Sequence, residues 1–543
     1  MTTNSHIDDN RVVIDGSTHH HGIALWPPPS NDPRDPLRWP RWLKIVALLS
    51  TALCNFTSNF AGSGPSVATT VFEMEFMKSA SDVNSLLTFN FLLLGLGNLF
   101  WVPVAVKFGK RAALIISMSL LFAVLCWTAK ASSFNSLLAA RCVSGFAASA
   151  GECIVPAIVN DLFFLHERAG MMSIYVIFTA SSTALGPLIA GYVVQYSPGT
   201  WRDYVWVSAA LAGFNLILVI LFYPESNFHR PHVAISNHSA ITDKERITPD
   251  TLEKTEETSS ELISVVGRNG SSAMAHGVQH VDHVQVPWTS IWFSFLSIDA
   301  QVSFITVAAR PLIALMHPAV VWGVFVYGAS LAAQVILIFA LPGFLIPPPY
   351  LFTPSQVGLM QVAALIGFFI AMVGGGYMAD IITVKRIIKE GGVSYPEQRL
   401  LSLIPGFFVS PAGCILIAFA CAEKFHWVAI AFGFGMISFG TVYAPNIAIT
   451  YVVEKNNEVA AESLVIINAF KNLVAFIFLY VAVDWIESSG WIQVYMILFM
   501  LVTLSIFAAI PLYIWGGRMG ERIEATWVYR KFLTAKYNDQ DSN

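Results

Sequence analysis

The stretch KFGKRAALIISMSLLFAVLCWTAK, residues 107–130, decides the fold class. It begins with the basic residues Lys107, Lys110 and Arg111 and continues as a run of uncharged, mostly apolar residues up to Lys130. About 20 such residues are enough for an α-helix to cross the hydrocarbon core of a bilayer. The stretch therefore predicts a transmembrane helix that is basic at its first end.

The chain contains twelve apolar runs of comparable length, six before and six after one long polar stretch. They cover residues 42–63, 84–105, 112–130, 136–159, 171–196, 204–223, 318–345, 356–379, 401–421, 426–452, 463–484 and 491–515. The composition agrees, because 55% hydrophobic residues, 12% charged residues and a mean hydropathy of +0.61 leave too little charge for a soluble surface. We expect an all-α membrane protein whose twelve transmembrane helices form two pseudo-symmetric six-helix bundles.

The distribution of lysine and arginine predicts the orientation. If the N-terminus is cytoplasmic, 25 of the 31 basic residues fall in cytoplasmic segments, only four fall in outer loops, and Arg141 and Lys471 lie within spans. Cytoplasmic loops of membrane proteins carry an excess of these residues. We therefore expect both termini in the cytoplasm, with an N-tail (1–41), a first bundle (42–223), a linker (224–317), a second bundle (318–516) and a C-tail (517–543).

The linker is predicted to be disordered in its first part. Residues 225–287 contain nine acidic residues and five lysines or arginines, with many Ser, Thr and Glu and almost no aromatic residues. Such a segment cannot bury enough apolar area to offset the entropy of ordering. Residues 288–309 are more apolar, but Asp299 and Gln301 near the middle favour a helix that lies in the membrane interface over a thirteenth span.

Several functional classes are disfavoured by what the sequence lacks. All six cysteines lie in or at the ends of apolar runs, where they read as packing residues, and three adjacent histidines, His19 to His21, make a poor metal site. We find no nucleophile, base or metal constellation of an enzyme, and no nucleotide-binding loop. We therefore expect no enzyme activity, no cofactor, no bound metal and no nucleic-acid partner, and the six-plus-six arrangement also argues against a channel or a seven-span receptor.

The charged side chains inside the spans are the main functional candidates. An ionisable side chain at the centre of a span costs at least ~2.5 kcal/mol, so it should face a water-filled cavity or a partner. Arg141 and Glu152 are eleven residues apart, which places them on nearly one helix face, about 16 Å apart along the axis. Glu152 can change its protonation state, whereas Arg141 effectively cannot. We expect Glu152 to carry a proton and Arg141 to tune a neighbouring acid, unless the two are a structural polar pair.

Further candidates for a substrate cavity lie in other spans. Lys471 shares a helix face with Asn468 and Asn472. It is expected to bind an anionic or carbonyl group of a substrate or to pair with an acid across the cavity, and the alternative is snorkelling to the interface. Four more residues are expected to line the same cavity. The alternative for them is a structural role, because asparagines also form hydrogen bonds between membrane helices. These residues are Asn55, Asn59, Tyr443 and Asn446.

Two predicted cytoplasmic loops, at equivalent places in the two halves of the chain, carry a similar pattern of glycine and charged residues. Gly109, Lys110 and Arg111 follow the second span, and residues 376–380, from Gly376 to Asp380, follow the eighth. Basic residues there can latch one conformation, although cytoplasmic loops are commonly basic. Over about residues 35–520 the chain resembles the major facilitator superfamily, in which these loops correspond to the two copies of motif A, with Val106 where the family usually has an aspartate.

Four longer stretches narrow the resemblance to fungal members of the drug:proton antiporter branch, including relatives that handle polyamines or histidinol. They are DPLRWPRW (35–42), FNFLLLGLGNLFWVP (89–103), DLFFLHER (161–168) and PEQRL (396–400). Arg141 resembles the arginine of motif B, which the family associates with proton coupling. Gly186, Pro187 and Gly191 resemble the antiporter motif C, with Ser182 and Ala190 replacing two of its glycines.

The resemblance implies a secondary transporter that works by alternating access. Motif C favours proton-coupled export of drug-like or secondary-metabolite compounds, and a carboxylate such as Glu152 as a cation site favours the alternative, import of a nutrient or a polyamine-type cation. The implied partners are a small-molecule substrate, protons and the lipid bilayer. The expected form is a monomer in the plasma membrane.

Overall fold

The computed structural model describes residues 19–20, 23–24, 35–228, 304–378, 396–455, 459–524 and 526. Almost every described element is a helix; the exceptions are the two-residue strands β1 (His19–His20) and β2 (Ile23–Ala24), which pair antiparallel. Residues 229–287 of the predicted disordered segment and most of the predicted interfacial helix lie outside these residues, whereas residues 225–228, at the start of that segment, are described and make specific contacts. The all-α class predicted from the sequence is confirmed.

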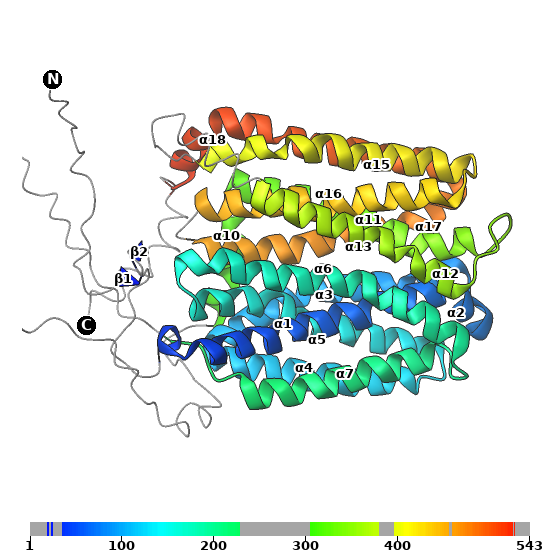
Figure 1. The fold of residues 1–543 in the computed structure, drawn as a ribbon, viewed down its shortest axis with the longest axis horizontal. Coiled ribbons are helices and arrows are strands. Elements are labelled where there is room, and N and C mark those ends of the chain that lie inside the picture. Colours follow the sequence, from blue (N-terminus) through cyan, green and yellow to red (C-terminus); the bar gives the residue numbers. More distant parts are fainter. Residues whose placement is uncertain are drawn as a thin grey trace, which may run out of the picture.

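The helices run almost parallel to one long axis of the molecule (Figure 1). The first half contains α1 (Arg41–Ser63), η2 (Gly64–Ala68), α2 (Thr69–Phe76), α3 (Ala80–Phe108), α4 (Lys110–Ala129), α5 (Phe134–Leu162), α6 (Leu165–Tyr196) and α7 (Trp201–Phe222). The second half contains α10 (Phe304–Ala314), α11 (Pro318–Leu345), α12 (Pro354–Leu359), α13 (Gln361–Met372), η5 (Val373–Met378), η6 (Pro396–Leu403), α15 (Ile404–Ala422), α16 (Trp427–Lys455), α17 (Ala460–Phe507) and α18 (Ala509–Glu524).

Eleven helical segments of the described chain are long and apolar enough to cross a membrane, and one of them holds two predicted spans. The segment that includes α17 is interrupted at Gly490, whose φ of 75° is left-handed and which glycine adopts without a steric penalty. The chain turns back at this residue, so α17 contains the eleventh predicted span and most of the twelfth. The eleven segments therefore account for all twelve predicted spans.

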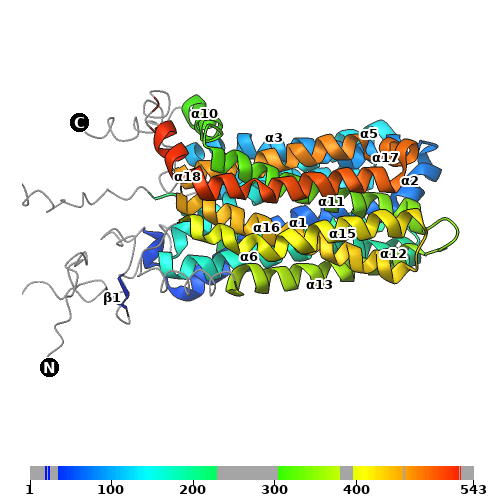
Figure 2. The ribbon, with the colours of Figure 1, turned by 90° about the horizontal axis from the view of Figure 1, so that it is seen from above.

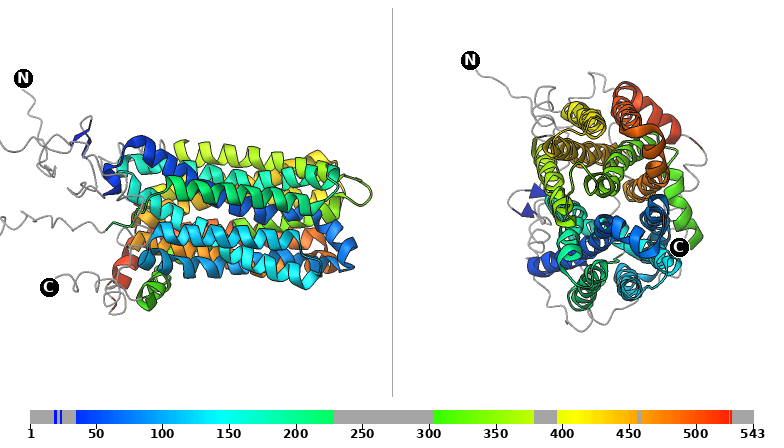
Figure 3. Two further views of the ribbon diagram at one scale, coloured as in Figure 1. Left: turned by 90° about the horizontal axis from the view of Figure 1, so that it is seen from below. Right: turned by 90° about the vertical axis from the view of Figure 1, so that its right-hand side faces the viewer.

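The two halves form separate bundles, which an end-on view shows side by side (Figure 3). Each bundle has its own core, one that includes Leu43, Leu114 and Ile158, and one that includes Phe434 and Tyr495. Large apolar side chains also cover the outside of the bundles: Phe369, Phe408 and Leu504 are each at least 65% exposed. A lipid environment explains such an apolar exterior, which a soluble protein of this size avoids.

The two ends of the molecule differ in their contacts. We call the end where α1 begins and α18 ends the terminal end, and the opposite end, which holds α2 and α12, the far end (Figure 1). Contacts between the two six-helix bundles, leaving aside α10, which precedes the second bundle, run from the far end to the middle, through α3 with α17 and through α6 with α12 and α13. At the terminal end, α10 lies beside α3 and α17 (Figure 2), and the ring of Phe304 meets that of Phe100 at 6.3 Å.

Candidate functional site

A buried ion pair joins the two halves at mid-length of their helices. Glu152 lies on α5 of the first half and Lys471 on α17 of the second half, and Lys471 Nζ is 2.6 Å from Glu152 Oε1. The two residues are only 7% and 5% exposed. We call them the interface ion pair. Removing one partner of a buried pair costs about 3–5 kcal/mol because the other charge stays buried without compensation.

The second carboxylate oxygen of Glu152 accepts two hydrogen bonds from amide groups. Asn98 on α3 donates from Nδ2 at 3.0 Å, and Asn472 on α17 donates from Nδ2 at 2.9 Å, both to Oε2. Donors from two helices, α3 and α17, therefore converge on one carboxylate of a third helix, α5. Hydrogen bonds to an ionised group are shorter and stronger than hydrogen bonds between neutral groups.

Two tyrosines complete the surroundings of the interface ion pair. Lys471 Nζ lies 4.1 Å from the centroid of the Tyr327 ring, which α11 supplies, and this geometry is that of a cation–π contact. Tyr175 on α6 donates its hydroxyl to the backbone oxygen of Glu152 at 3.2 Å. Side chains from five helices of both halves thus surround one acid and one base. We call the set of Glu152, Lys471, Asn98, Asn472 and Tyr327 the interface cluster.

Arg141 lies elsewhere on α5 and does not contact Glu152. Its guanidinium donates to the backbone oxygens of Ala61 at 3.2 Å and Gly62 at 2.8 Å, and more weakly to that of Leu86 at 3.4 Å. The carbonyls of residues 61 and 62 lie in the last turn of α1, where the helix dipole is negative. Arg141 therefore ties α5 to the end of α1, and the predicted tuning of a neighbouring acid stays a prediction.

The small residues between Arg141 and Glu152 are used for helix packing in this conformation. A Cβ atom at Gly145 would collide with the backbone oxygen of Asn90 on α3, and one at Gly151 would lie 3.1 Å from the backbone of Asn55 on α1. The structure shows a helix face that α1 and α3 approach closely, because these residues have no bulky side chain.

The other predicted cavity residues fall into separate places. Asn55 on α1 donates to Thr179 on α6 at 2.6 Å, and Asn59 donates to Asn55 Oδ1 at 3.1 Å, so this pair links two helices of the first half. The Tyr443 hydroxyl donates to the backbone oxygen of Ser402 at 2.8 Å. Asn446 and Asn468 are half-buried on α16 and α17. Of the seven predicted cavity residues, only Lys471 and Asn472 join the interface cluster.

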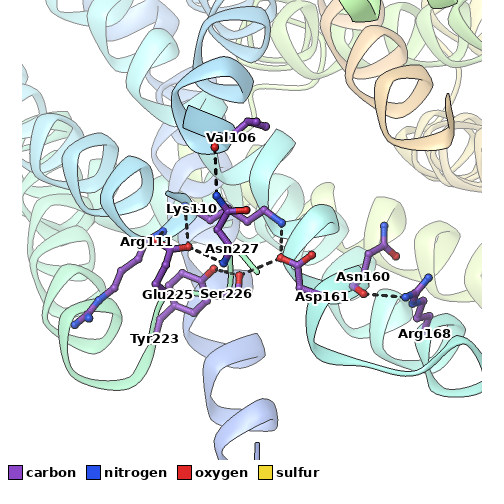
Figure 4. Close-up of polar contacts among 10 residues, drawn as sticks. All are labelled: Val106, Lys110, Arg111, Asn160, Asp161, Arg168, Tyr223, Glu225, Ser226 and Asn227. Atoms are coloured by element: carbon purple, nitrogen blue, oxygen red, sulfur yellow. Dashed lines mark hydrogen bonds and ion pairs between the residues drawn. The ribbon is translucent and has the colours of Figure 1, made fainter. Parts of the chain in front are cut away.

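The first motif A loop forms a polar network at the terminal end (Figure 4). Gly109 has a φ of 103°, which allows the tight turn between α3 and α4. Lys110 forms an ion pair with Asp161 at the end of α5. The Glu225 carboxylate accepts from the backbone N–H of Lys110 at 3.1 Å and of Arg111 at 3.0 Å, which caps α4.

Glu225 lies two residues after the sixth predicted span, at the start of the segment that was predicted to be disordered, and no role was predicted for it from the sequence. Burial raises the pKa of its carboxyl group, and hydrogen bonds from the backbone of Asn227, Arg111 and Lys110 oppose that shift. Asn227 also donates to the backbone oxygen of Val106 at 3.2 Å, the position where the family usually has an acid. The segment that follows α7 in the sequence therefore binds to the α3–α4 turn through Glu225 and Asn227.

The equivalent region of the second half is only partly described. Gly376 lies in η5, and Asp380 is outside the described residues. Two ion pairs there link η6 to the end of α16. Arg399 Nε is 2.7 Å from Glu454 Oε1, and Lys455 Nζ is 2.9 Å from Glu397 Oε1.

The motif C residues pack α6 against helices of both halves. A Cβ atom at Gly186 would lie 2.8 Å from the backbone oxygen of Phe60 on α1, and one at Gly191 would lie 2.5 Å from that of Pro354 on α12. The backbone oxygen of Pro187 lies close to Gly358 of the same region of the second half. Gly191 and Pro187 are thus at the contact between the halves near the far end.

A small crevice with a volume of only about 10 Å³ lies apart from the interface cluster. Residues of α11, α16 and α18 line it at the terminal end, among them His317, Tyr451 and Lys455. Burial, together with the charge of Lys455, lowers the pKa of His317. None of its lining residues belongs to the interface cluster.

Sequence reasoning missed Asn98, Tyr175 and Tyr327. Asn98 has a usable signal, because it is an amide within an apolar span, like the asparagines that were singled out. The two tyrosines have none, because tyrosine is common in apolar helices and only packing shows which ring meets a charge. The pairing of Lys471 with an acid across the halves was one of the alternatives that the sequence left open.

Comparisons with known proteins agree with this architecture. The sequence profile of the Major Facilitator Superfamily matches residues 49–479. Protein HOL1 of Saccharomyces cerevisiae is 25% identical over 94% of this chain and 92% of its own length, and the MFS antiporter QDR3 of Candida albicans is 20% identical over 85% and 76%. The xylose transporter XylE of E. coli, solved in a partially occluded inward-open conformation, covers 87% of this chain and 97% of its own, with a TM-score of 0.55 and 14% identity.

Proposed function

We propose a function for this chain on the premise that it belongs to the Major Facilitator Superfamily, whose profile covers residues 49–479. It is a multi-pass membrane protein and a secondary transporter, not an enzyme. We infer that it couples proton movement to the export of amphipathic organic compounds by alternating access. The observation that carries this inference is the interface ion pair, a titratable carboxylate that bonds the two halves to each other.

The proton acts on the contact between the halves. When Glu152 is ionised, its charge holds Lys471 of the other half at 2.6 Å, and both charges are compensated. When Glu152 takes up a proton, the attraction across the interface falls and the halves can move relative to each other. Movement of the halves about a central site is the basis of alternating access. Protonation and conformation are therefore coupled at one residue.

The proposed orientation assigns the conformation. Because 25 of the 31 basic residues fall in segments predicted to be cytoplasmic, we place the terminal end, where α1 begins, in the cytoplasm and the far end on the outside. The contacts between the two six-helix bundles run from the far end to the middle, which supports a conformation closed toward the outside. We place the protein in the plasma membrane as a monomer with both termini in the cytoplasm.

Two observations favour export. Pro187 and Gly191, which resemble motif C, lie at the contact between the halves, where they can affect how the far end opens. The relative from Candida albicans is named an antiporter. In an antiporter, protons that enter from the outside drive substrate out of the cell.

A second candidate function is import of an organic cation. The interface cluster favours it, because a carboxylate and an aromatic face form a cation site that the protein's own Lys471 ammonium occupies. A positively charged substrate could compete with Lys471 for Glu152. In that case the same acid would bind the substrate and the proton alternately.

The purified protein in liposomes tests the proposal. A panel of labelled amphipathic compounds and polyamines is offered while the proton gradient is directed inward or outward. Export predicts that substrate accumulates against an opposing proton flux, and import predicts that both move in the same direction. Glu152→Gln should abolish accumulation driven by the gradient but retain substrate exchange, because glutamine keeps the shape and cannot ionise. Glu423→Gln, at an exposed acid of the far end, is the control. Gradient-driven accumulation by Glu152→Gln at the normal level would refute the assignment.

A further inference from the structure

Protonation of Glu152 leaves the buried charge of Lys471 without a compensating carboxylate, and the proposed function does not say what then stabilises that charge. Lys471 stays positively charged, is 5% exposed, and loses the carboxylate that compensated it. Among the residues that the structure describes, Lys471 forms an ion pair with no second carboxylate. An uncompensated buried charge is strongly destabilising, so the ammonium needs another favourable partner in the protonated state.

The partner that the structure offers is the Tyr327 ring. Its centroid is 4.1 Å from Lys471 Nζ, within the distance at which a cation over an aromatic face is attracted by the ring quadrupole. The ring comes from α11, in the same half as Lys471, so the contact persists when the two halves separate. Asn98 and Asn472 both direct their amide N–H groups toward Glu152, so the groups they present there are donors.

We propose that Tyr327 is a positioning residue that holds the Lys471 ammonium in the second half whenever a proton on Glu152 breaks the interface ion pair. This inference rests on the proposed role of Glu152 as the proton carrier. The other titratable groups that face the pair are Tyr175 on α6 and Cys153 beside Glu152 on α5. Both are neutral in the ordinary pH range and therefore do not compensate the charge of Lys471.

The proposal predicts the sign of a pH effect. Loss of the ring destabilises the state with protonated Glu152 and an unpaired ammonium more than the state with the ion pair intact. A higher proton concentration is then needed to reach the protonated state. The pH midpoint of proton-driven transport should move to more acidic values by about one unit, a tenfold change that corresponds to about 1.4 kcal/mol.

The test compares Tyr327→Leu with Tyr327→Phe in liposomes, with transport measured across a pH series. Tyr327→Leu should shift the midpoint by about one unit, and Tyr327→Phe, which keeps the aromatic face, should restore most of the normal midpoint. Phe325→Leu is the matched control, because this residue lies on the same helix and is 57% exposed. If Tyr327→Leu does not reach the membrane, phenylalanine analogues of increasing fluorine content at position 327 weaken the quadrupole without changing the shape, and the midpoint should then fall stepwise.

The outcomes separate this inference from the function on which it rests. Glu152→Gln is measured in parallel. If it transports with a normal pH midpoint, the proton role of Glu152 fails, and the role of Tyr327 fails with it. If Glu152→Gln loses pH dependence but Tyr327→Leu and the fluorinated series keep the normal midpoint, only the inference about Tyr327 is overturned. An acidic shift in Tyr327→Leu together with recovery in Tyr327→Phe supports both.

Discussion

The interface ion pair makes a quantitative prediction about stability. Glu152→Gln and Lys471→Met each remove one charge while keeping most of the side-chain volume. Each single variant should lose about 3–5 kcal/mol of unfolding free energy, because the remaining charge is buried at 7% exposure or less and has lost its partner at 2.6 Å. The double variant should lose much less than the sum, because it leaves no charge uncompensated. We expect a coupling energy of at least about 2 kcal/mol.

The assay is a double-mutant cycle in mixed micelles, with the free energy of unfolding measured by reversible denaturation. Lys78 and Asp82 provide a control pair. They are 3.9 Å apart and 43% and 51% exposed, so they should couple by less than about 1 kcal/mol. If the interface pair couples no more strongly than this control pair, the two charges do not compensate each other, and the reasoning about the interface is wrong.

Three further predictions concern other parts of the chain. Gly95→Ala should push α3 away from α17, because the new Cβ atom would lie 2.8 Å from the backbone oxygen of Ala469. The rate at which a thiol reagent labels a cysteine placed at Ser81 should therefore increase. The control Gly343→Ala should leave this labelling rate unchanged, because no atom lies within 4 Å of its Cβ position. The lowered pKa of His317 keeps this side chain neutral in the folded protein, whereas the unfolded chain takes up a proton there as the pH falls from about 7 to about 5. Thermal stability should therefore decrease over this pH range. His317→Gln should make the thermal stability less dependent on pH. Asn237 and Asn269 should carry no glycan if the linker is cytoplasmic, and a mass decrease of the native protein on glycosidase treatment would contradict the orientation.

The partners of the buried charges show the limit of sequence reasoning. The rule that ionisable groups in a span need a partner singled out Arg141, Glu152 and Lys471, and all three are buried with polar partners. The rule does not say which partner each one has. Arg141 shares a helix face with Glu152, yet its shortest hydrogen bonds go to the carbonyls at the end of α1, because side chains about 16 Å apart along an axis lie at different levels of the bundle.

The sequence by itself determined the number and length of the spanning helices, the division into two halves and the membership of the superfamily. The physical reason is that the bilayer acts on each segment separately: about 20 apolar residues form a helix in lipid because every backbone polar group must be satisfied within it. Only the tertiary structure shows that Glu152 forms an ion pair with Lys471 and accepts a hydrogen bond from Asn472, which is 320 residues away along the chain. Only the tertiary structure likewise shows that Glu225 caps α4 beside Val106. These contacts depend on how α3, α5, α11 and α17 pack, and no local periodicity encodes the distance between residues on different helices.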